Sequence, residues 1–327
     1  MRRRDFMGGI AGSAAWSLAA RAQQPERVRR IATLTGIANE AGGQERFTIF
    51  VQALAQLGWI VGRNVRIDSR WGGGEAGAIR KHAGELVALA PDVIMATGGA
   101  TVGQLLQITR TVPIVFTIVP DPVGSGFVNS LSRPGGNATG FVQFEYSLAG
   151  KWLELLKEIV PGTTRAAIIW DPLQTAAIGQ YAVIQAVAPS LGVEIFPINV
   201  RELADAERGI AAFARGGGSG MIVTAAALVV VHREQITALA TQHKLPTVYP
   251  FPEFVANGGL VSYGADLPTQ MRQAAGYVDR ILKGEKPADL PVQAPTKYNL
   301  VVNLKAAKDL GLTIPPAVLT RSDEVIE

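Results

Sequence analysis

The sequence predicts an α/β protein made of two doubly wound parallel-sheet lobes joined by a hinge. Short apolar runs alternate with amphipathic segments of helical length along the chain. This alternation occurs in two successive blocks of similar size, without a long linker between them. The 327 residues, 48% of them hydrophobic, also suffice for two separate cores. Strands separated by helices pair in parallel through right-handed crossovers, which gives two open sheets.

The first block follows the order strand, helix, strand, helix, strand, helix, strand. Apolar, β-branched runs predict its strands, and apolar residues three or four positions apart predict its helices. We expect strands at 28–33, 64–70, 92–96 and 112–119, and helices at 43–57, 78–89 and 101–108.

The second block repeats this order after a helix near 151–156 that begins the second lobe. We expect strands at 165–170, 193–198, 221–224 and 247–249, and helices at 176–191, 202–214 and 232–243.

The end of the chain departs from the tandem order. We expect a strand at 260–263, a helix at 268–282, a strand at 298–302 and a helix at 304–310, with a Pro-rich segment before the last strand. A chain that continues after the second lobe is complete can cross back, and several crossings form a hinge suited to closure around a ligand. We therefore expect lobe 1 to contain 28–142 plus about 252–297, and lobe 2 to contain 143–251 plus about 298–327.

The first 22 residues read as a signal peptide. A basic start, Arg2-Arg3-Arg4, precedes a Gly/Ala-rich middle, and Ala20-Arg21-Ala22 offers a cleavage site. Arg3-Arg4-Asp5-Phe6-Met7 resembles a twin-arginine export motif, although a disordered basic tail is the alternative. We expect a mature protein that is soluble and periplasmic. The signal carries a charge of +3 out of the net +4, so the remaining chain lacks the basic excess of a nucleic-acid-binding protein.

Catalytic and metal-binding patterns are poor in this sequence. It contains no cysteine, and its three histidines lack metal-ligand spacing. There is no nucleophile elbow and no P-loop. The GxGxxG match at 72–77 follows the second strand rather than the first, so a flexible helix-entry loop is the preferred interpretation. We expect a protein that is not an enzyme and that uses no metal or cofactor.

Polar and aromatic residues gather where predicted strands end. In open parallel sheets, ligands bind beyond the carboxyl ends of the strands. Thr97-Gly98-Gly99 enters a helix whose first N–H groups can hold an anion, and Asp121 lies in a stiff Pro-Asp-Pro loop. Trp170-Asp171 and Tyr249 end strands of the second block. The alternative is that the threonines and aspartates only cap turns and helices and that the aromatic side chains belong to the core.

Four long segments resemble the ABC-transporter substrate-binding proteins related to the tryptophan/tyrosine-binding group. They are PIVFTIVPDPVGSGFVNSLSRPGGNATG at 113–140, LGWIVGRNVRIDSRW at 57–71, KWLELLKEIVP at 151–161, and the stretch 276–315 that ends in LKAAKDLGLTIP. The resemblance covers nearly the whole mature chain. It implies a type I periplasmic binding fold with three crossings between the lobes, and a membrane permease that receives the solute.

The resemblance also implies which residues line the cleft. These are Thr97, Gly98, Gly99, Thr117, Asp121, Trp170, Asp171, Tyr249, Tyr263 and Asp266. Many relatives place an aspartate after the strand at 221–224, whereas this chain has Ala225-Ala226-Ala227 there. An α-amino group would lose that partner unless Asp121, Asp171 or Asp266 replaces it.

The resulting expectation is a monomeric solute-binding component of an ABC importer. Its small-molecule ligand would be an amino acid, aromatic or branched, or an aromatic acid, and its partner a cognate ABC permease. Two alternatives stay open: a ligand-sensing binding protein that serves a receptor, and, less favoured, an enzyme on a doubly wound fold.

Overall fold

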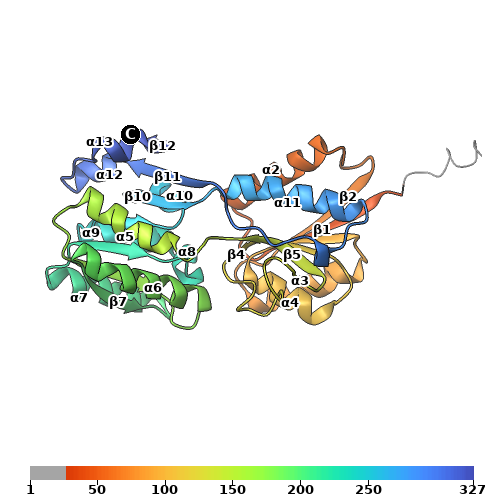
Figure 1. The fold of residues 1–327 in the computed structure, drawn as a ribbon, viewed down its shortest axis with the longest axis horizontal. Helices are drawn as coiled ribbons and strands as arrows, with labels where there is room; N and C mark the ends of the chain where they lie inside the picture. The colour runs from red at the N-terminus through yellow and green to blue at the C-terminus, as the bar shows by residue number, and fades with distance from the viewer. Residues whose placement is uncertain (1–26) are drawn as a thin grey trace, which may run out of the picture.

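The computed structural model describes residues 27–327, which form two lobes side by side (Figure 1). Each lobe contains one sheet, and the predicted two-lobed α/β class is confirmed. The expected signal peptide, 1–22, lies outside the described residues. No helix within 27–327 is long and apolar enough to cross a membrane.

Lobe 1 is built on a five-stranded parallel sheet in the order β2-β1-β3-β4-β5. Its strands are β1 Arg29–Thr35, β2 Val65–Trp71, β3 Val93–Thr97, β4 Ile114–Val119 and β5 Ala138–Val142. Its helices are α2 Ala41–Gln56, α3 Ala76–Ala88, α4 Gly99–Ile108, α11 Leu267–Leu282 and the short 3₁₀ turn η2 Pro287–Asp289. Helices α2 and α11 bury one face of the sheet, and α3 and α4 bury the other. Strands covered on both faces are apolar throughout, as their sequences show.

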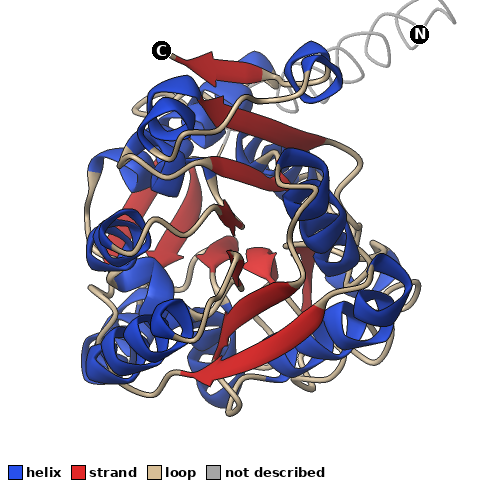
Figure 2. Cartoon of the chain, turned by 90° about the vertical axis from the view of Figure 1, so that its left-hand side faces the viewer, coloured by secondary structure: helices blue, strands red, loops and turns tan. Residues whose placement is uncertain are grey.

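Lobe 2 is built on a seven-stranded sheet in the order β12-β11-β10-β9-β8-β6-β7. Its strands are β6 Arg165–Trp170, β7 Glu194–Asn199, β8 Gly220–Val223, β9 Thr247–Tyr249, β10 Val261–Ala265, β11 Tyr298–Asn303 and β12 Glu324–Ile326. Its helices are α5 Leu148–Ile159, α6 Thr175–Val187, η1 Ala188–Leu191, α7 Leu203–Arg215, α8 Ala227–Val231, α9 Arg233–Gln242, α10 Pro252–Ala256, α12 Leu304–Asp309 and α13 Pro316–Thr320. Figure 2 shows helices on both sides of this sheet. Only β10 and β11 pair in antiparallel fashion among its described strand pairs.

One expected lobe boundary is wrong. The residues from about 252 were assigned to lobe 1, but α10 packs in lobe 2 and β10 pairs with β9 and β11 of the seven-stranded sheet. The chain returns to lobe 1 only with α11. The sequence could not show this, because a strand followed by a helix fits either sheet, and only pairing decides between them.

The chain crosses between the lobes three times, at 143–147, at Asp266 and at 291–297. The third crossing forms a bridge to the end of β5, where Val142 N–H donates to the Gln293 carbonyl at 2.9 Å and Gln293 N–H donates to the Gly140 carbonyl at 2.9 Å. Asp266 N–H donates to the Lys297 carbonyl at 3.0 Å, which joins the second crossing to the third. The three crossings therefore lie together as one hinge.

A close approach between β4 and β5 positions the loop that follows β4. The strand register shifts between Phe116 and Val119, and Ile118 takes a positive φ of 56°. A Cβ atom on Gly140 would lie 2.0 Å from the Phe116 carbonyl oxygen, and the φ of Gly140 is +153°. Only glycine fits there without moving the backbone.

Replacing Gly140 with alanine is expected to destabilise the protein by about 2 kcal/mol or more, because the added methyl group overlaps the β4 backbone. Urea unfolding followed by circular dichroism measures this. Gly162→Ala is the matched control, since a Cβ atom at Gly162 meets no atom within 4 Å. Equal unfolding free energies for the two variants would contradict the predicted close approach.

Candidate functional site between the lobes

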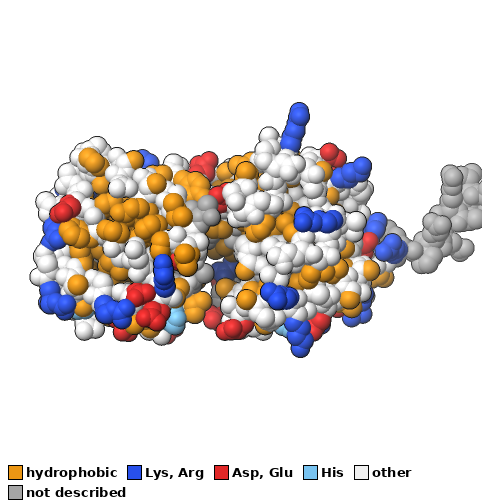
Figure 3. All heavy atoms as spheres, turned by 90° about the horizontal axis from the view of Figure 1, so that it is seen from below, with side chains coloured by type: hydrophobic (Ala, Val, Ile, Leu, Met, Phe, Trp, Pro, Cys, Tyr) orange, Lys and Arg blue, Asp and Glu red, His pale blue; other side chains and the backbone are white. Residues whose placement is uncertain are grey.

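The carboxyl ends of the strands in the two lobes face one another. Two ion pairs join elements that follow those strand ends: Arg46 of α2 to Glu253 of α10, at 2.8 Å, and Glu40 before α2 to Arg233 of α9, at 3.0 Å. Seen from below, the molecule is hollowed between the lobes (Figure 3). This is the place where an open α/β sheet binds its ligand.

Lobe 1 contributes the end of β3 and the start of α4. Thr97 and Thr117 pair in register on β3 and β4, and their hydroxyl oxygens are 3.4 Å apart. Gly98 adopts a φ of +94°, and its N–H donates to the Thr117 carbonyl at 3.0 Å. No side chain of residues 27–327 caps α4, which begins at Gly99, so its first N–H groups are available to an anionic group. The Thr101 hydroxyl turns back to the Gly98 carbonyl at 2.7 Å and does not cap the helix.

Asp121 lies at this edge but is engaged with its own loop and with the hinge. One carboxylate oxygen accepts the Gly124 N–H at 2.7 Å, and the other accepts the Tyr146 hydroxyl at 3.2 Å. Tyr146 belongs to the first crossing, and its ring packs against Gly179 of α6. Burial and the neighbouring Asp121 charge raise the pKa of Tyr146 to about 12, so the hydroxyl stays a donor at any ordinary pH. Asp121 therefore fixes the first crossing to lobe 1.

Trp170 and Asp171 lie together at the edge of lobe 2. The Trp170 ring stacks on Tyr181 of α6, with centroids 4.5 Å apart and planes 12° apart. Asp171 accepts the Leu173 N–H at 2.9 Å and the Gln174 side-chain amide at 2.8 Å. Its role in the fold is to cap the turn before α6, the capping alternative raised by the sequence.

Tyr249 does not line the cleft, and that prediction is wrong. Its side chain is 1% exposed and stacks on Phe254 with centroids 4.9 Å apart, and burial raises its pKa. Tyr263 is half-buried and packs 5.9 Å from the Tyr298 ring, while its carbonyl accepts the Trp152 indole N–H. Of the three aromatic residues predicted at the cleft, Tyr249 belongs to the core, whereas Trp170 and Tyr263 are only partly buried.

Asp266 lies in the hinge rather than on the cleft surface. It is 5% exposed, caps α11 by accepting the Thr269 N–H at 2.9 Å, and pairs with Lys297 at 2.9 Å. Burial disfavours its charge, but Lys297 and the Thr269 N–H outweigh that cost and hold the pKa of Asp266 below its ordinary value. The resemblance places Asp266 in the cleft as one possible partner of an α-amino group, but here its two carboxylate oxygens are used by the Thr269 N–H and by Lys297.

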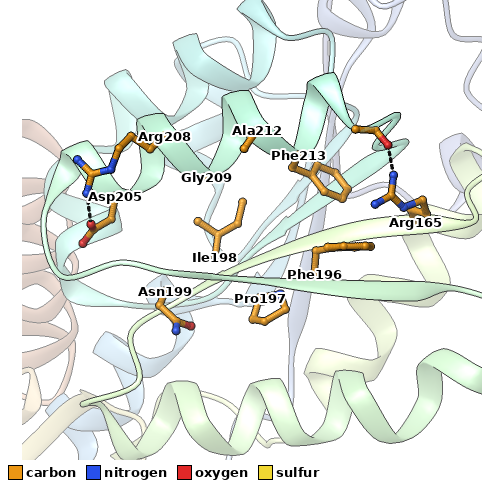
Figure 4. A pocket seen from close by; sticks show the side chains of 11 residues that line it. Arg165, Phe196, Pro197, Ile198, Asn199, Asp205, Arg208, Gly209, Ala212 and Phe213 are labelled. Carbon is orange, nitrogen blue, oxygen red and sulfur yellow. Dashed lines mark hydrogen bonds and ion pairs between the residues drawn. The ribbon is translucent and has the colours of Figure 1, made fainter.

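A separate groove of about 410 Å³ runs along the outer edge of lobe 2, between β7 and α7 (Figure 4). Arg165 covers the Phe196 ring at 4.3 Å and donates to the Gly216 carbonyl, while Arg208 pairs with Asp205 at 2.7 Å. These charged groups are paired within the lobe, and the groove follows β7, the strand at the outer edge of the sheet.

Sequence reasoning missed four residues at the cleft and the hinge: Arg46, Glu253, Tyr146, and Gln180 of α6, whose amide oxygen accepts the Ala225 N–H just past the end of β8. Arg46 and Glu253 are 207 positions apart, and no spacing rule links them. Tyr146 carried a weak signal, since it follows the Gly-rich segment at the predicted crossing. Gln180 sits inside a predicted helix without a motif around it.

The Asp266–Lys297 pair predicts a specific pH dependence of stability. Because the pKa of Asp266 is lowered by folding, the stabilisation is complete above the unfolded pKa of about 4 and is lost as pH falls through the lower folded value. Asp266→Asn keeps a capping oxygen and should lose about 1 kcal/mol above pH 5, with the difference from wild type shrinking toward pH 2. Unfolding free energies measured from pH 2 to pH 6 test this, with the exposed Asp309→Asn as control. A difference that stays constant over that range would contradict the ion-pair role.

Comparison with known proteins agrees with this geometry. A family model described as ABC transporter substrate binding protein matches residues 36–326. A tyrosine-binding protein from Clostridioides difficile (strain R20291) is 24% identical over 263 residues, which cover 80% of this chain and 75% of that protein. A conserved domain protein from Vibrio cholerae has a structure with a TM-score of 0.84 and 28% identity, over 91% of this chain and 100% of that one. The ABC domain from Streptococcus pneumonia in complex with L-Trp has a TM-score of 0.83 and 23% identity, over 91% and 99% of the two chains. The chain belongs to the ABC transporter substrate-binding protein family.

Proposed function

We propose that this chain is the solute-binding component of an ABC importer. It binds an aromatic amino acid or an aromatic acid between the lobes, and it passes the solute to a permease in the membrane. The observation that carries the proposal is that the carboxyl ends of the strands in the two lobes face one another, beside a hinge made of three chain crossings. The relatives' names, a tyrosine-binding protein and a complex with L-Trp, support an aromatic ligand.

In this proposed function, the protein binds its ligand and performs no reaction on it. Binding would come from apolar contact with rings such as Trp170 and from a few fixed polar groups such as the uncapped start of α4. A periplasmic location for the mature chain fits the expected signal peptide and the importer role. We propose that the protein works as a monomer, since one chain supplies both halves of the cleft.

The ligand class is tested by native mass spectrometry of freshly purified protein, followed by isothermal titration with the aromatic amino acids and aromatic acids. We expect one co-purified small molecule and saturable binding of at least one aromatic solute. Absence of binding to any small solute, together with turnover of one, would contradict the proposed function.

The two ion pairs between the lobes are expected to stabilise the closed arrangement. Arg46 is 16% exposed, so its attraction to Glu253 is only partly screened by water. A ligand that contacts both lobes binds more tightly when the closed state is more populated.

Reversing one charge, Arg46→Glu or Glu253→Arg, should therefore weaken ligand binding by about threefold to tenfold. The double reversal restores opposite charges and should recover part of the affinity. Isothermal titration measures the effect. Asp205→Asn is the control, because it breaks a pair with Arg208 that lies within lobe 2. Wild-type affinity in both single variants would show that the pairs do not influence closure.

A further inference from the structure

Two buried N–H donors at the lobe 2 edge lack an acceptor within residues 27–327. They are the indole nitrogen of Trp170 and the side-chain amide nitrogen of Gln180. We propose that these donors form a subsite for a carboxylate of the ligand, and that Gln180 is a ligand-binding residue of this chain. The inference rests on the proposed solute-binding function and names the chemistry that lobe 2 recognises.

Gln180 is held in one orientation by the backbone. It is 1% exposed, and its amide oxygen accepts the Ala225 N–H at 3.3 Å. Ala225 follows the end of β8, so this contact places the Gln180 amide at the strand ends of lobe 2. With the oxygen committed, the amide nitrogen is left as the free donor.

Trp170 lies at the same edge of lobe 2 as the backbone group that holds this amide. β6 and β8 are neighbouring strands, and Ile169 of β6 pairs with Val223 of β8. Trp170 is the next residue after Ile169, and Ala225 is the second residue after Val223, so both lie just past the same pair. Tyr181, the residue after Gln180, stacks on the Trp170 ring. Both donors therefore come from residues at the carboxyl ends of neighbouring strands or on the helix packed against them.

The two free N–H donors favour a carboxylate over an ammonium group, because an ammonium group carries no hydrogen-bond acceptor. Ala225 and Ala226 bring no charge to the end of β8. Asp171, the nearest carboxylate in sequence to Trp170, already accepts two hydrogen bonds from its own turn. Across the cleft, the start of α4 also presents N–H groups. Donors on both sides suit an acceptor-bearing ligand.

Leaving two buried donors unpaired is costly, and buried polar groups in folded proteins are almost always satisfied. A carboxylate placed against both nitrogens removes this cost and forms charge-assisted hydrogen bonds. The predicted ligand class is a carboxylate attached to an aromatic or apolar body. An aromatic amino acid and its deaminated acid share this chemistry, and the probes below distinguish them.

The test measures binding of three matched probes: L-tryptophan, indole-3-propionate, which lacks the amino group, and tryptamine, which lacks the carboxylate. We expect at least one of the two carboxylates to bind and tryptamine not to bind. Trp170→Phe keeps an aromatic ring but removes the donor, and should weaken carboxylate binding about tenfold to hundredfold. Gln180→Glu keeps the oxygen that accepts the Ala225 N–H but replaces the donor with an anion, so it should weaken binding at least as much.

Gln242→Glu on α9 is the control for the added charge, because Gln242 is exposed, and it should bind like wild type. Thermal unfolding of each variant verifies folding. If Trp170→Phe and Gln180→Glu, folded, bind the carboxylates as wild type does, or if tryptamine binds best, the subsite is wrong while the binding function stands. If wild type binds neither these probes nor any solute seen by native mass spectrometry, the proposed function itself fails.

Discussion

The tied crossings between the lobes are the constraint on which the rest of the structure depends. Backbone hydrogen bonds join the end of β5 to Gln293, and Asp266 joins the second crossing to Lys297. Gln270 of α11 adds a side-chain bond to the Val142 carbonyl at 2.9 Å. Each cluster of buried hydrophobic residues lies within one lobe, an arrangement that suits rotation of the lobes as rigid bodies about the hinge. The strand ends then approach or separate together.

Two carboxylates that the sequence predicts as ligand-binding residues, Asp121 and Asp266, have a different role in the structure. Asp121 and Asp266 are both used by the hinge, the first through the Tyr146 hydroxyl and the second through Lys297 and the start of α11. Their placement beside the cleft follows from the same topology, since hinge and cleft both begin where strands end. A carboxylate at a strand end can therefore set the position of the lobes and leave ligand contact to its neighbours.

The sequence predicted most of the fold because its signals are local. Apolar runs bounded by Gly and Pro located ten of the strands, and helical spacing located the long helices. β5 was missed because it follows Gly135-Gly136 and contains glycine, and β12 because its strand is short and carries Glu324. The predicted boundary of lobe 2 was wrong because only strand pairing, which the sequence does not show, assigns β10 to the sheet of lobe 2. Within the site, Thr97 and Trp170 lie at the strand ends where the sequence predicts them, whereas Thr117 is fully buried inside β4. The burial of Tyr249 and the donor of Gln180 depend on contacts between distant segments.

If the lobes close on their ligand, the distance between them changes when the solute binds. The chain has no cysteine, so single cysteines introduced at the exposed positions Gln107 in lobe 1 and Gln242 in lobe 2 can carry spin labels without background. Pulsed electron spin resonance then measures the label-to-label distance with and without a bound solute. Saturating ligand should narrow the distance distribution and shift it to the closed arrangement. A broad distribution that is the same with and without a bound ligand would contradict closure of the lobes around the solute.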